Sequence, residues 1–436
     1  MKQAEFKKRR AALMKQIGKG NIAIIGSAPE RTRNRDVHYP FRQDSDFFYL
    51  TGFNEPEALA VFIPGREQGE YVLFCREFDE KKALWEGAHA GLEGATQHYA
   101  ADDSFPISDL DDILPGMLEN KGKVFYPMGK DSELDHKLLE WINHIRKQSR
   151  TGVMAPGELV SLEHVVHEMR LFKSAEELKL MRHAAEVSAR AHVRAMKACK
   201  PGLYEYQIEA ELVHEFLTEG LRAVAYPSIV AGGKNACVLH YTENKDKLHK
   251  GDLLLIDAGV ECDHYAADIT RTFPVSGKFS EPQRLLYQLV LDAQAAALAE
   301  IKPGVPWNKA HDASVETLTR GLVELGLLKG RVKKLIKDEK YKQFYMHRIG
   351  HWLGMDVHDV GAYKIKDDWR LLEPGMVLTV EPGLYVPVDC ESVDNPWRGI
   401  GIRIEDDVLV TKDGHEILTG GVPKSIEAIE ALMQGN

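Results

Sequence analysis

The chain has 436 residues, of which 44% are hydrophobic and 28% charged, as expected of a globular protein with more than one core. Its net charge of −10 argues against a nucleic-acid partner, because phosphate binders usually present a basic surface. No apolar run reaches transmembrane length and the charged N-terminus lacks a signal-peptide core, so we expect no membrane partner. Five cysteines without a Cys-x-x-Cys pair are typical of reduced thiols in a cytoplasmic protein.

The first 173 residues alternate between strand and helix patterns. Short apolar runs at 21–26, 58–63, 71–76 and 123–126 predict buried strands, and the periodicity of 133–146 predicts an amphipathic helix capped by Ser132. We also expect an acidic loop at 102–112, and a solvated helix face at the basic residues 7–10. Residues 1–173 are therefore predicted to form an α/β domain.

A helix–helix–strands unit occurs twice from residue 174 onward. Each copy begins with a capping-box sequence, at Ser174 in the first copy and at Ser280 in the second. A Lys-Pro-Gly breaker at 200–202 or 302–304 ends that helix, and another helix follows, over about 204–219 or from about 307. The repetition predicts one duplicated α/β domain, residues 174–436, in preference to two separate small domains.

Each copy ends in a pair of strands that carries two acids. Segments 251–260 and 375–384 share a Gly turn, an apolar run, an acid (Asp257 or Glu381) and a Gly two residues later. A second strand then brings Asp268 or Glu405. Taken alone, Asp257 and Asp268 would fit a turn former and an unrelated exposed acid. Four carboxylates that converge on a core would repel one another, however, and a pair of divalent cations removes that cost.

Histidines near the second copy extend this pattern. Segment 346–359 places His347, His351 and His358 among apolar residues, with Gly350 and Gly354 allowing a close approach of the backbone. Four carboxylates and one imidazole suit Mn²⁺, Co²⁺, Fe²⁺ or Zn²⁺ better than Ca²⁺, and no cysteines have the spacing of a structural zinc site. The sequence also lacks a zincin helix, a serine-hydrolase elbow and a phosphate-binding loop.

These residues together resemble a known family. In chain order, the acids and the histidine are similar to the complete ligand set of the dinuclear pita-bread metallopeptidases: Asp257, Asp268, His351, Glu381 and Glu405. Segments 346–359 and 39–56 closely resemble those of Xaa-Pro aminopeptidases (aminopeptidase P), and the resemblance covers nearly the whole chain. It implies an α/β fold with an N-terminal α/β domain followed by a pseudo-twofold pita-bread domain. It also implies a metalloexopeptidase that releases the N-terminal residue from peptides with proline in second position.

The resemblance further implies how two divalent metals would be held. Asp268 and Glu405 would bridge them, Asp257 would hold one, and His351 with Glu381 would hold the other. Mn²⁺ is the favoured ion, with Co²⁺ or Zn²⁺ as alternatives. A hydroxide shared by both metals would attack the carbonyl before proline, while Glu381 takes and returns a proton.

Four further residues have implied roles toward the peptide. His240 and His358 would stabilise the oxyanion and position the peptide around the scissile bond. His347 and Arg403 would line the side that receives proline and the residues after it.

Two other functions stay open at this stage. A prolidase would use the same metals on Xaa-Pro dipeptides alone, and a non-catalytic pita-bread module would bind peptides without cleaving them. The family resemblance also implies a homodimer or homotetramer. Trp85 is then either a residue that reaches a neighbouring active site or an ordinary exposed aromatic residue.

Overall fold

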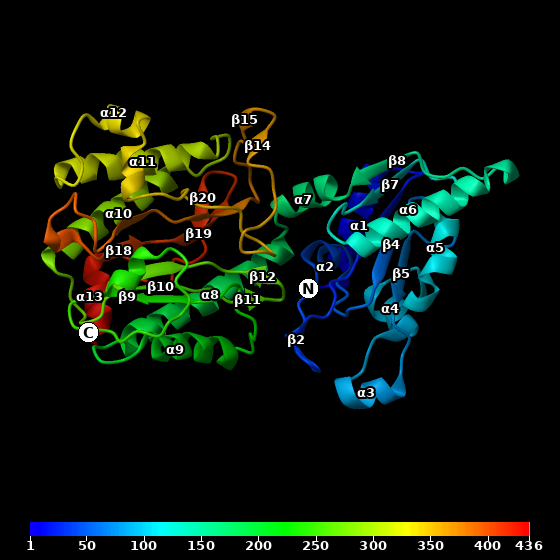
Figure 1. Ribbon diagram of the computed structural model, residues 1–436, viewed down its shortest axis with the longest axis horizontal. Helices are drawn as coiled ribbons and strands as arrows, with labels where there is room; N and C mark the ends of the chain where they lie inside the picture. Colours follow the sequence, from blue (N-terminus) through cyan, green and yellow to red (C-terminus); the bar gives the residue numbers. More distant parts are fainter. Residues whose placement is uncertain (436) are drawn as a thin grey trace. The chain divides into compact units, whose positions relative to one another are not determined.

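The computed structural model describes residues 1–435 (Figure 1). The chain divides between Arg170 and Leu171 into two compact units, three residues before the expected boundary. Within residues 1–435, no helix has both the length and the apolar character needed to cross a membrane. The five cysteines are free thiols.

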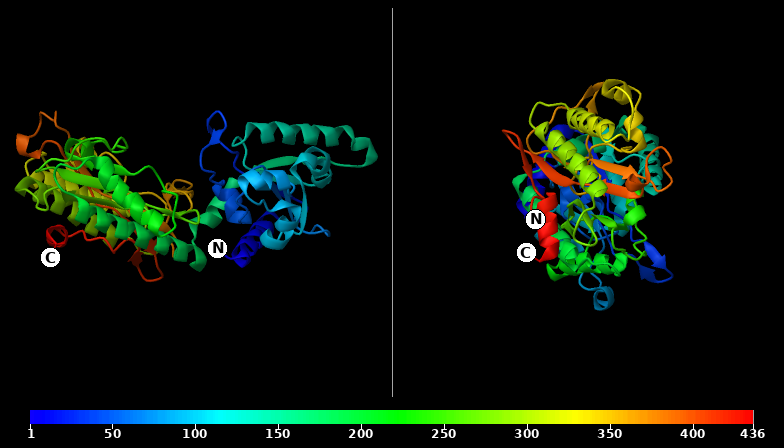
Figure 2. Two further views of the ribbon diagram at one scale, coloured as in Figure 1. Left: turned by 90° about the horizontal axis from the view of Figure 1, so that it is seen from below. Right: turned by 90° about the vertical axis from the view of Figure 1, so that its left-hand side faces the viewer.

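The first unit is built on a six-stranded mixed sheet with the order β6-β5-β4-β1-β7-β8. The strands are β1 (Ile22–Gly26), β4 (Leu59–Phe62), β5 (Tyr71–Cys75), β6 (Asp103–Pro106), β7 (Lys123–Tyr126) and β8 (Glu158–Ser161). Apolar residues of α5 (Leu110–Leu118) and α6 (Ser132–Lys147) pack on one face of the sheet. Helix α1 (Gln3–Ile17) lies on the opposite side from α6 (Figure 2, left). The four strands predicted for this part of the chain are confirmed.

The other elements of this unit are short. They are β2 (Thr32–Asn34), β3 (Val37–His38), α2 (Ser45–Thr51), α3 (Glu80–Glu86), α4 (Gly91–Tyr99) and α7 (Glu163–Leu171), the last of which reaches the division between the units.

Three predictions for the first unit were wrong in detail. Helix α6 is capped by the carboxylate of Asp131, which accepts from the backbone N–H groups of Glu133 and Leu134, while Ser132 is already helical. The expected acidic loop instead contains β6 and the start of α5, because its apolar residues Phe105 and Leu110 pack against the core. Acidic side chains between apolar ones obscured both elements.

The third correction concerns the basic cluster of α1. Lys7 and Lys8 are exposed as expected, but Arg9 and Arg10 are each 3% exposed. Their guanidinium groups donate to the carbonyl oxygens of Tyr49 and Leu50, at 3.1 Å each. A long arginine side chain on a helix can therefore serve as a buried tie between elements, which sequence alone does not distinguish from a solvated charge.

The second unit contains the duplicated arrangement. The first copy consists of α8 (Ala175–Ala198), α9 (Glu205–Thr218) and a sheet of β9 (Ile229–Gly232), β10 (Leu253–Asp257) and β13 (Thr270–Pro274). The second copy consists of α10 (Glu281–Ala299), α11 (Asn308–Glu324) and a sheet of β16 (Val377–Val380), β19 (Asp406–Val410) and β20 (His415–Ile417). Both capping boxes are present, and the predicted repetition is confirmed.

The remaining elements of this unit connect and border the two copies. They are β11 (Glu261–Cys262), β12 (Tyr265–Ala266), α12 (Val332–Lys337), β14 (Lys364–Ile365), β15 (Asp368–Trp369), β17 (Gly383–Val386), β18 (Ile400–Arg403) and α13 (Ile426–Gln434). In Figure 1 the pairs α8–α9 and α10–α11 lie on opposite sides of the central strands. A single hydrophobic cluster draws residues from all four helices, from the sheet of the first copy and from β17 and β18, so the helices of both halves share one core.

Candidate metal centre

Strand pairing places the two acids of the first copy at one end of its sheet. Strand β10 ends at Asp257, which lies opposite Thr270 in the antiparallel pairing with β13, and Asp268 lies two residues before Thr270. A Cβ atom on Gly259 would lie 1.7 Å from the carbonyl oxygen of Ala267. Only glycine therefore allows the two segments to approach this closely, and the close approach brings both carboxylates to the same place.

The second copy delivers its acids in the same way. Val380, the last residue of β16, pairs with Asp406, the first residue of β19. Glu381 and Glu405 are the residues just beyond that pair, so they lie at the same end of their sheet. The backbone N–H of Glu405 donates to the carbonyl oxygen of Thr270 at 3.0 Å, which joins the ends of the two sheets.

His351 enters between the acids of both copies. Its backbone N–H donates to Thr379 Oγ1 at 3.0 Å, and its Nδ1 lies 3.0 Å from the carbonyl oxygen of Trp352. Since a carbonyl can only accept, Nδ1 carries the proton, and in the neutral ring Nε2 presents a lone pair. This Nε2 lies 3.4 Å from Asp268 Oδ2 and 3.7 Å from Glu381 Oε1.

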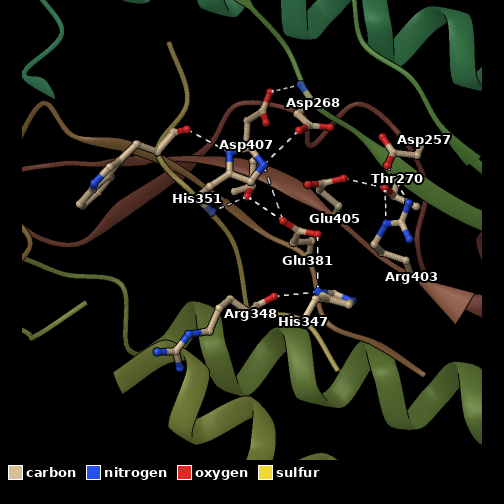
Figure 3. Close-up of polar contacts among 12 residues, drawn as sticks. Asp257, Asp268, Thr270, His347, Arg348, His351, Glu381, Arg403, Glu405 and Asp407 are labelled. Carbon is tan, nitrogen blue, oxygen red and sulfur yellow. Dashed lines mark hydrogen bonds and ion pairs between the residues drawn. The ribbon is translucent and has the colours of Figure 1, made fainter. Parts of the chain in front are cut away.

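The side chains converge as a metal site requires. Ligand atoms of Asp268, His351 and Glu405 all lie within 4.8 Å of one another. Figure 3 shows these side chains and that of Glu381 directed toward one another, while the side chain of Arg348 points away from them. Asp257 lies beside this group and forms an ion pair with Arg403 Nη2 at 2.6 Å.

Burial makes this cluster of carboxylates unfavourable in the absence of cations. It raises the pKa of Glu381 to about 7, despite the positive charges of His351 and Arg403. Burial, followed by the charges of the neighbouring acids, raises the pKa of Glu405 well above its usual value. Burial also raises the pKa of Asp257, although Arg403 opposes the shift.

Asp268 and His351 behave as an ion pair under the same conditions. Burial opposes the charged form of Asp268, but the hydrogen bond and charge of His351, together with Tyr226 and Arg403, outweigh it and lower the pKa of Asp268. Burial likewise opposes the charged form of His351, yet Asp268 and Glu381 raise the pKa of His351 to about 9. Four acids with one imidazole carry a surplus of negative charge in a desolvated site. This donor set fits divalent cations, which supply the missing positive charge.

A cavity of about 550 Å³ opens beside these side chains. Its lining contains all nine residues predicted for the site: Asp257, Asp268, His351, Glu381, Glu405, His240, His347, His358 and Arg403. The rings of His240 and His358 are exposed, and that of His358 packs edge-on against His351 with centroids 4.3 Å apart. The structure therefore brings every predicted site residue into one place.

Comparison with known proteins identifies the family. Residues 179–412 match the family model of metallopeptidase family M24, and residues 6–126 match that of the aminopeptidase P N-terminal domain. The Xaa-Pro aminopeptidase of Escherichia coli K12 is 46% identical over 430 residues, which cover 98% of this chain and 97% of that protein. The chain belongs to the aminopeptidase P group of metallopeptidase family M24.

Solved structures agree with this assignment. Pseudomonas aeruginosa aminopeptidase PepP is 57% identical, with a TM-score of 0.98 and coverage of 100% of this chain and 98% of that one. Zinc-substituted Escherichia coli aminopeptidase P in complex with product is 46% identical, with a TM-score of 0.97 and coverage of 100% and 99%. The predicted family and the predicted pita-bread fold are confirmed.

Sequence reasoning missed several residues of this aminopeptidase P site. The Tyr226 hydroxyl lies 2.6 Å from Asp257 Oδ1 and also contacts Asp268 Oδ1, so it spans the two acids of the first copy. The Thr270 hydroxyl donates to Glu405 Oε2 at 2.6 Å. Neither Tyr226 nor Thr270 belongs to a charged or glycine-marked motif, and so nothing in the sequence distinguished them from ordinary residues.

A chain of hydrogen bonds on the cavity wall was also missed. Arg403 Nη1 donates to the Tyr385 hydroxyl at 3.0 Å, and that hydroxyl lies 2.9 Å from His347 Nε2. His347 Nδ1 lies 2.7 Å from the carbonyl oxygen of Arg348 and so carries the proton, leaving Nε2 to accept from Tyr385. Burial, followed by the charge of Arg403, lowers the pKa of His347 to about 3, which keeps the ring neutral.

Proposed function

We propose that this chain is an Xaa-Pro aminopeptidase that uses two divalent metal ions to release the N-terminal residue from peptides with proline in second position. The observation that carries the proposal is the convergence of four carboxylates, two buried and two half-buried, and one imidazole on a cavity also lined by further histidines. Membership of the aminopeptidase P group supports the specificity for proline.

The five residues divide between two metals in this proposal. Asp268 and Glu405 would hold both ions, Asp257 would hold one, and His351 with Glu381 would hold the other. Mn²⁺ is the favoured ion, with Co²⁺ or Zn²⁺ as alternatives, because oxygen donors outnumber the single nitrogen. When bound, two such cations supply Lewis-acid polarisation of a carbonyl and lower the pKa of water.

The surrounding side chains complete the chemistry. Glu381 accepts a proton during attack and returns it to the leaving nitrogen. His240 and His358 donate to the oxyanion and position the peptide. His347, held neutral by burial and by the charge of Arg403, lines the side that receives proline.

The nature of the Xaa-Pro bond explains why such a site suits it. This bond has no N–H group, so an enzyme that must bind the scissile N–H rejects it. A site built from cations and histidines needs only the carbonyl oxygen and a route for a proton to the tertiary nitrogen.

The contacts of Arg403 favour the aminopeptidase over a prolidase. A dipeptidase needs a cation that is free to bind the carboxylate directly after proline, and Arg403 is a candidate for that clamp. Its guanidinium group already donates to Thr270, Tyr385 and Asp257, and the Asp257 carboxylate, 2.6 Å from Nη2, balances its charge. A non-catalytic binding module is disfavoured because such a module has no need to gather four mutually repelling acids.

We extend the proposal to the protein's surroundings. Residues 1–173 and 174–436 act as the N-terminal domain and the catalytic domain of a cytoplasmic enzyme, whose partners are its peptide substrates. We propose a homodimer or homotetramer, because Leu84 and Trp85 on α3 are 83% and 86% exposed and offer an apolar surface.

Substrate length tests the proposed function. Steady-state kinetics of the Mn²⁺-loaded protein on Xaa-Pro-Xaa tripeptides should give kcat/KM equal to or above that on Xaa-Pro dipeptides. A chelator should abolish the activity, and added Mn²⁺ or Co²⁺ should restore it. Activity confined to dipeptides would make the protein a prolidase. Full activity in a preparation shown to be metal-free would refute the two-metal proposal.

A further inference from the structure

Asp359, the last residue of segment 346–359, takes no part in the site described above. Its carboxylate instead accepts from Lys173 Nζ at 2.9 Å, and both side chains are 1% exposed. A buried ion pair is costly to desolvate and is often no more stabilising than apolar residues of the same size. Its presence one residue after His358 therefore calls for a reason other than stability.

The loop that carries His358 closes around this ion pair. A Cβ atom on Gly354 would lie 2.1 Å from Asp359 Oδ2 and 2.9 Å from Lys173 Cε, so the backbone is in contact with both partners. The Asp359 N–H donates to the carbonyl oxygen of Trp352 at 2.9 Å and closes the loop on itself. The ion pair is thus the centre around which residues 352–359 fold.

Lys173 in turn is fixed to the framework of the second copy. Its backbone N–H donates to the carbonyl oxygen of Gly375 at 2.9 Å, and the Gly375 N–H donates to the carbonyl oxygen of Val410 at 2.9 Å. Gly375 precedes β16, which leads to Glu381, and Val410 ends β19, which follows Glu405. The ammonium group therefore ties the loop to the two strands that carry these acids.

His358 itself has little else to hold it. Its exposed ring packs against His351, but among residues 1–435 the ring makes no hydrogen bond. The position of the ring thus depends on the backbone of its neighbours. The nearest fixed point along the chain is the next residue, Asp359.

We propose that Lys173 and Asp359 form a buried clamp that positions His358 over the cavity. Neither residue is a catalytic residue; both act through the backbone of the loop. The inference rests on the proposed function only in that His358 is taken to act on the peptide. A displacement of about 1 Å of such a group can cost on the order of 100-fold in rate.

Kinetics on the Mn²⁺-loaded full chain test the clamp. Lys173→Met should lower kcat on an Xaa-Pro-Xaa tripeptide by about 10- to 100-fold, with KM within about threefold and both metals retained. In a His358→Ala background the same change should cost less than about threefold, because the ring that it positions is already absent. Arg182→Met is the control, since it removes a cation from an exposed ion pair with Glu416 and should leave kcat unchanged.

A second variant is needed because Lys173→Met leaves an unpaired buried carboxylate, which could prevent folding. The double variant Lys173→Met/Asp359→Asn removes both charges, and its crystal structure should show the His358 ring displaced or disordered. A folded variant with kcat within about threefold of wild type refutes the clamp, as does an undiminished loss in the His358→Ala background. Failure of the wild-type chain to cleave the tripeptide would instead refute the proposed function, and the ring position would still decide the clamp.

Discussion

The two copies within the second unit share a framework but differ in how they hold their acids. In each copy a capped helix is followed by another helix and by an antiparallel strand pair that ends at two carboxylates. In the first copy, Asp257 receives hydrogen bonds from Tyr226 and Arg403. In the second copy, burial raises the pKa of Glu381 to about 7 and raises that of Glu405 well above its usual value.

The histidines are distributed just as unevenly. The second copy supplies His347, His351 and His358, whereas the first supplies His240. Duplication therefore explains where four acids come from, and divergence of the connecting segments explains the chemistry around them. Glu381, the acid proposed to move a proton, accepts a long hydrogen bond from Thr379 Oγ1 at 3.3 Å, whereas Asp257 and Glu405 accept hydrogen bonds of 2.6 Å from Tyr226 and Thr270.

The largest expected effect tests whether both copies are needed equally. Asp268→Asn and Glu405→Gln each remove a proposed bridging acid, one from each copy. Because a bridging ligand serves both ions, each variant should lose more than about 10³-fold in kcat and at least one metal ion. Elemental analysis and steady-state kinetics measure both. Near-wild-type rate with two bound metals in either variant would contradict the bridging assignment.

The next prediction tests whether the histidines outside the proposed ligand set act without binding metal. His358→Ala should lower kcat by about 10²- to 10³-fold, the scale of losing one oxyanion donor, while metal content stays nearly intact. His240→Ala makes the same test for the first copy, and its decrease in kcat should be in the same range if both rings donate to the oxyanion. Loss of one ion from His358→Ala would make His358 a metal ligand instead.

A smaller effect concerns stability at low pH, because each copy buries a neutral histidine in a helix. Burial lowers the pKa of His192 on α8 and of His311 on α11 to about 4. Below the ordinary pKa of 6.5, the unfolded chain binds a proton that the folded chain excludes. The contribution of each histidine to the free energy of unfolding is thus fully present above pH 6.5. It is lost as pH falls toward 4, by about 3 kcal/mol for a pKa shift of this size.

His192→Gln measures that contribution. The Nε2–H of His192 donates to the carbonyl oxygen of Ala258 at 2.9 Å, a bond that a glutamine amide can replace. The decrease in the urea unfolding midpoint of the catalytic unit between pH 6.5 and 4 should be smaller in this variant than in wild type. An identical pH dependence would show that His192 is protonated in the folded protein.

The smallest expected effect lies at the start of the second copy. Ser280 and Gln283 form the capping box of α10, in which the Ser280 N–H donates to Gln283 Oε1 at 2.9 Å. Ser280→Ala should cost about 1 kcal/mol of unfolding free energy and leave kcat unchanged. Chemical denaturation with a parallel activity assay measures both quantities. A large loss of activity would contradict this prediction, because it would show that the helix cap also affects the metal centre.

Much of this protein could be predicted from its sequence because the decisive signals are local. Capping boxes, Lys-Pro-Gly breakers and apolar runs that end in acids act over a few residues, and their repetition revealed the duplication. The four acids were singled out in the same way, since each stands out against apolar neighbours, whereas the choice of His351 among three histidines followed from the family resemblance. Charge buried beside a strand has few structural explanations, and a metal site is one of them.

Only the tertiary structure decided how those residues are supported. Tyr226 and Thr270 carry neutral hydroxyls, and Arg9 and Arg10 look like solvated charges until the residues that face them are known. Lys173 and Asp359 are 186 residues apart in the chain, so no local pattern can pair them. A hydrogen bond or ion pair depends on a partner brought close by folding, whereas helix caps and strand ends depend on adjacent residues. The sequence by itself therefore determined the framework and the acids, and the packing of distant segments decided which neutral and paired groups orient them.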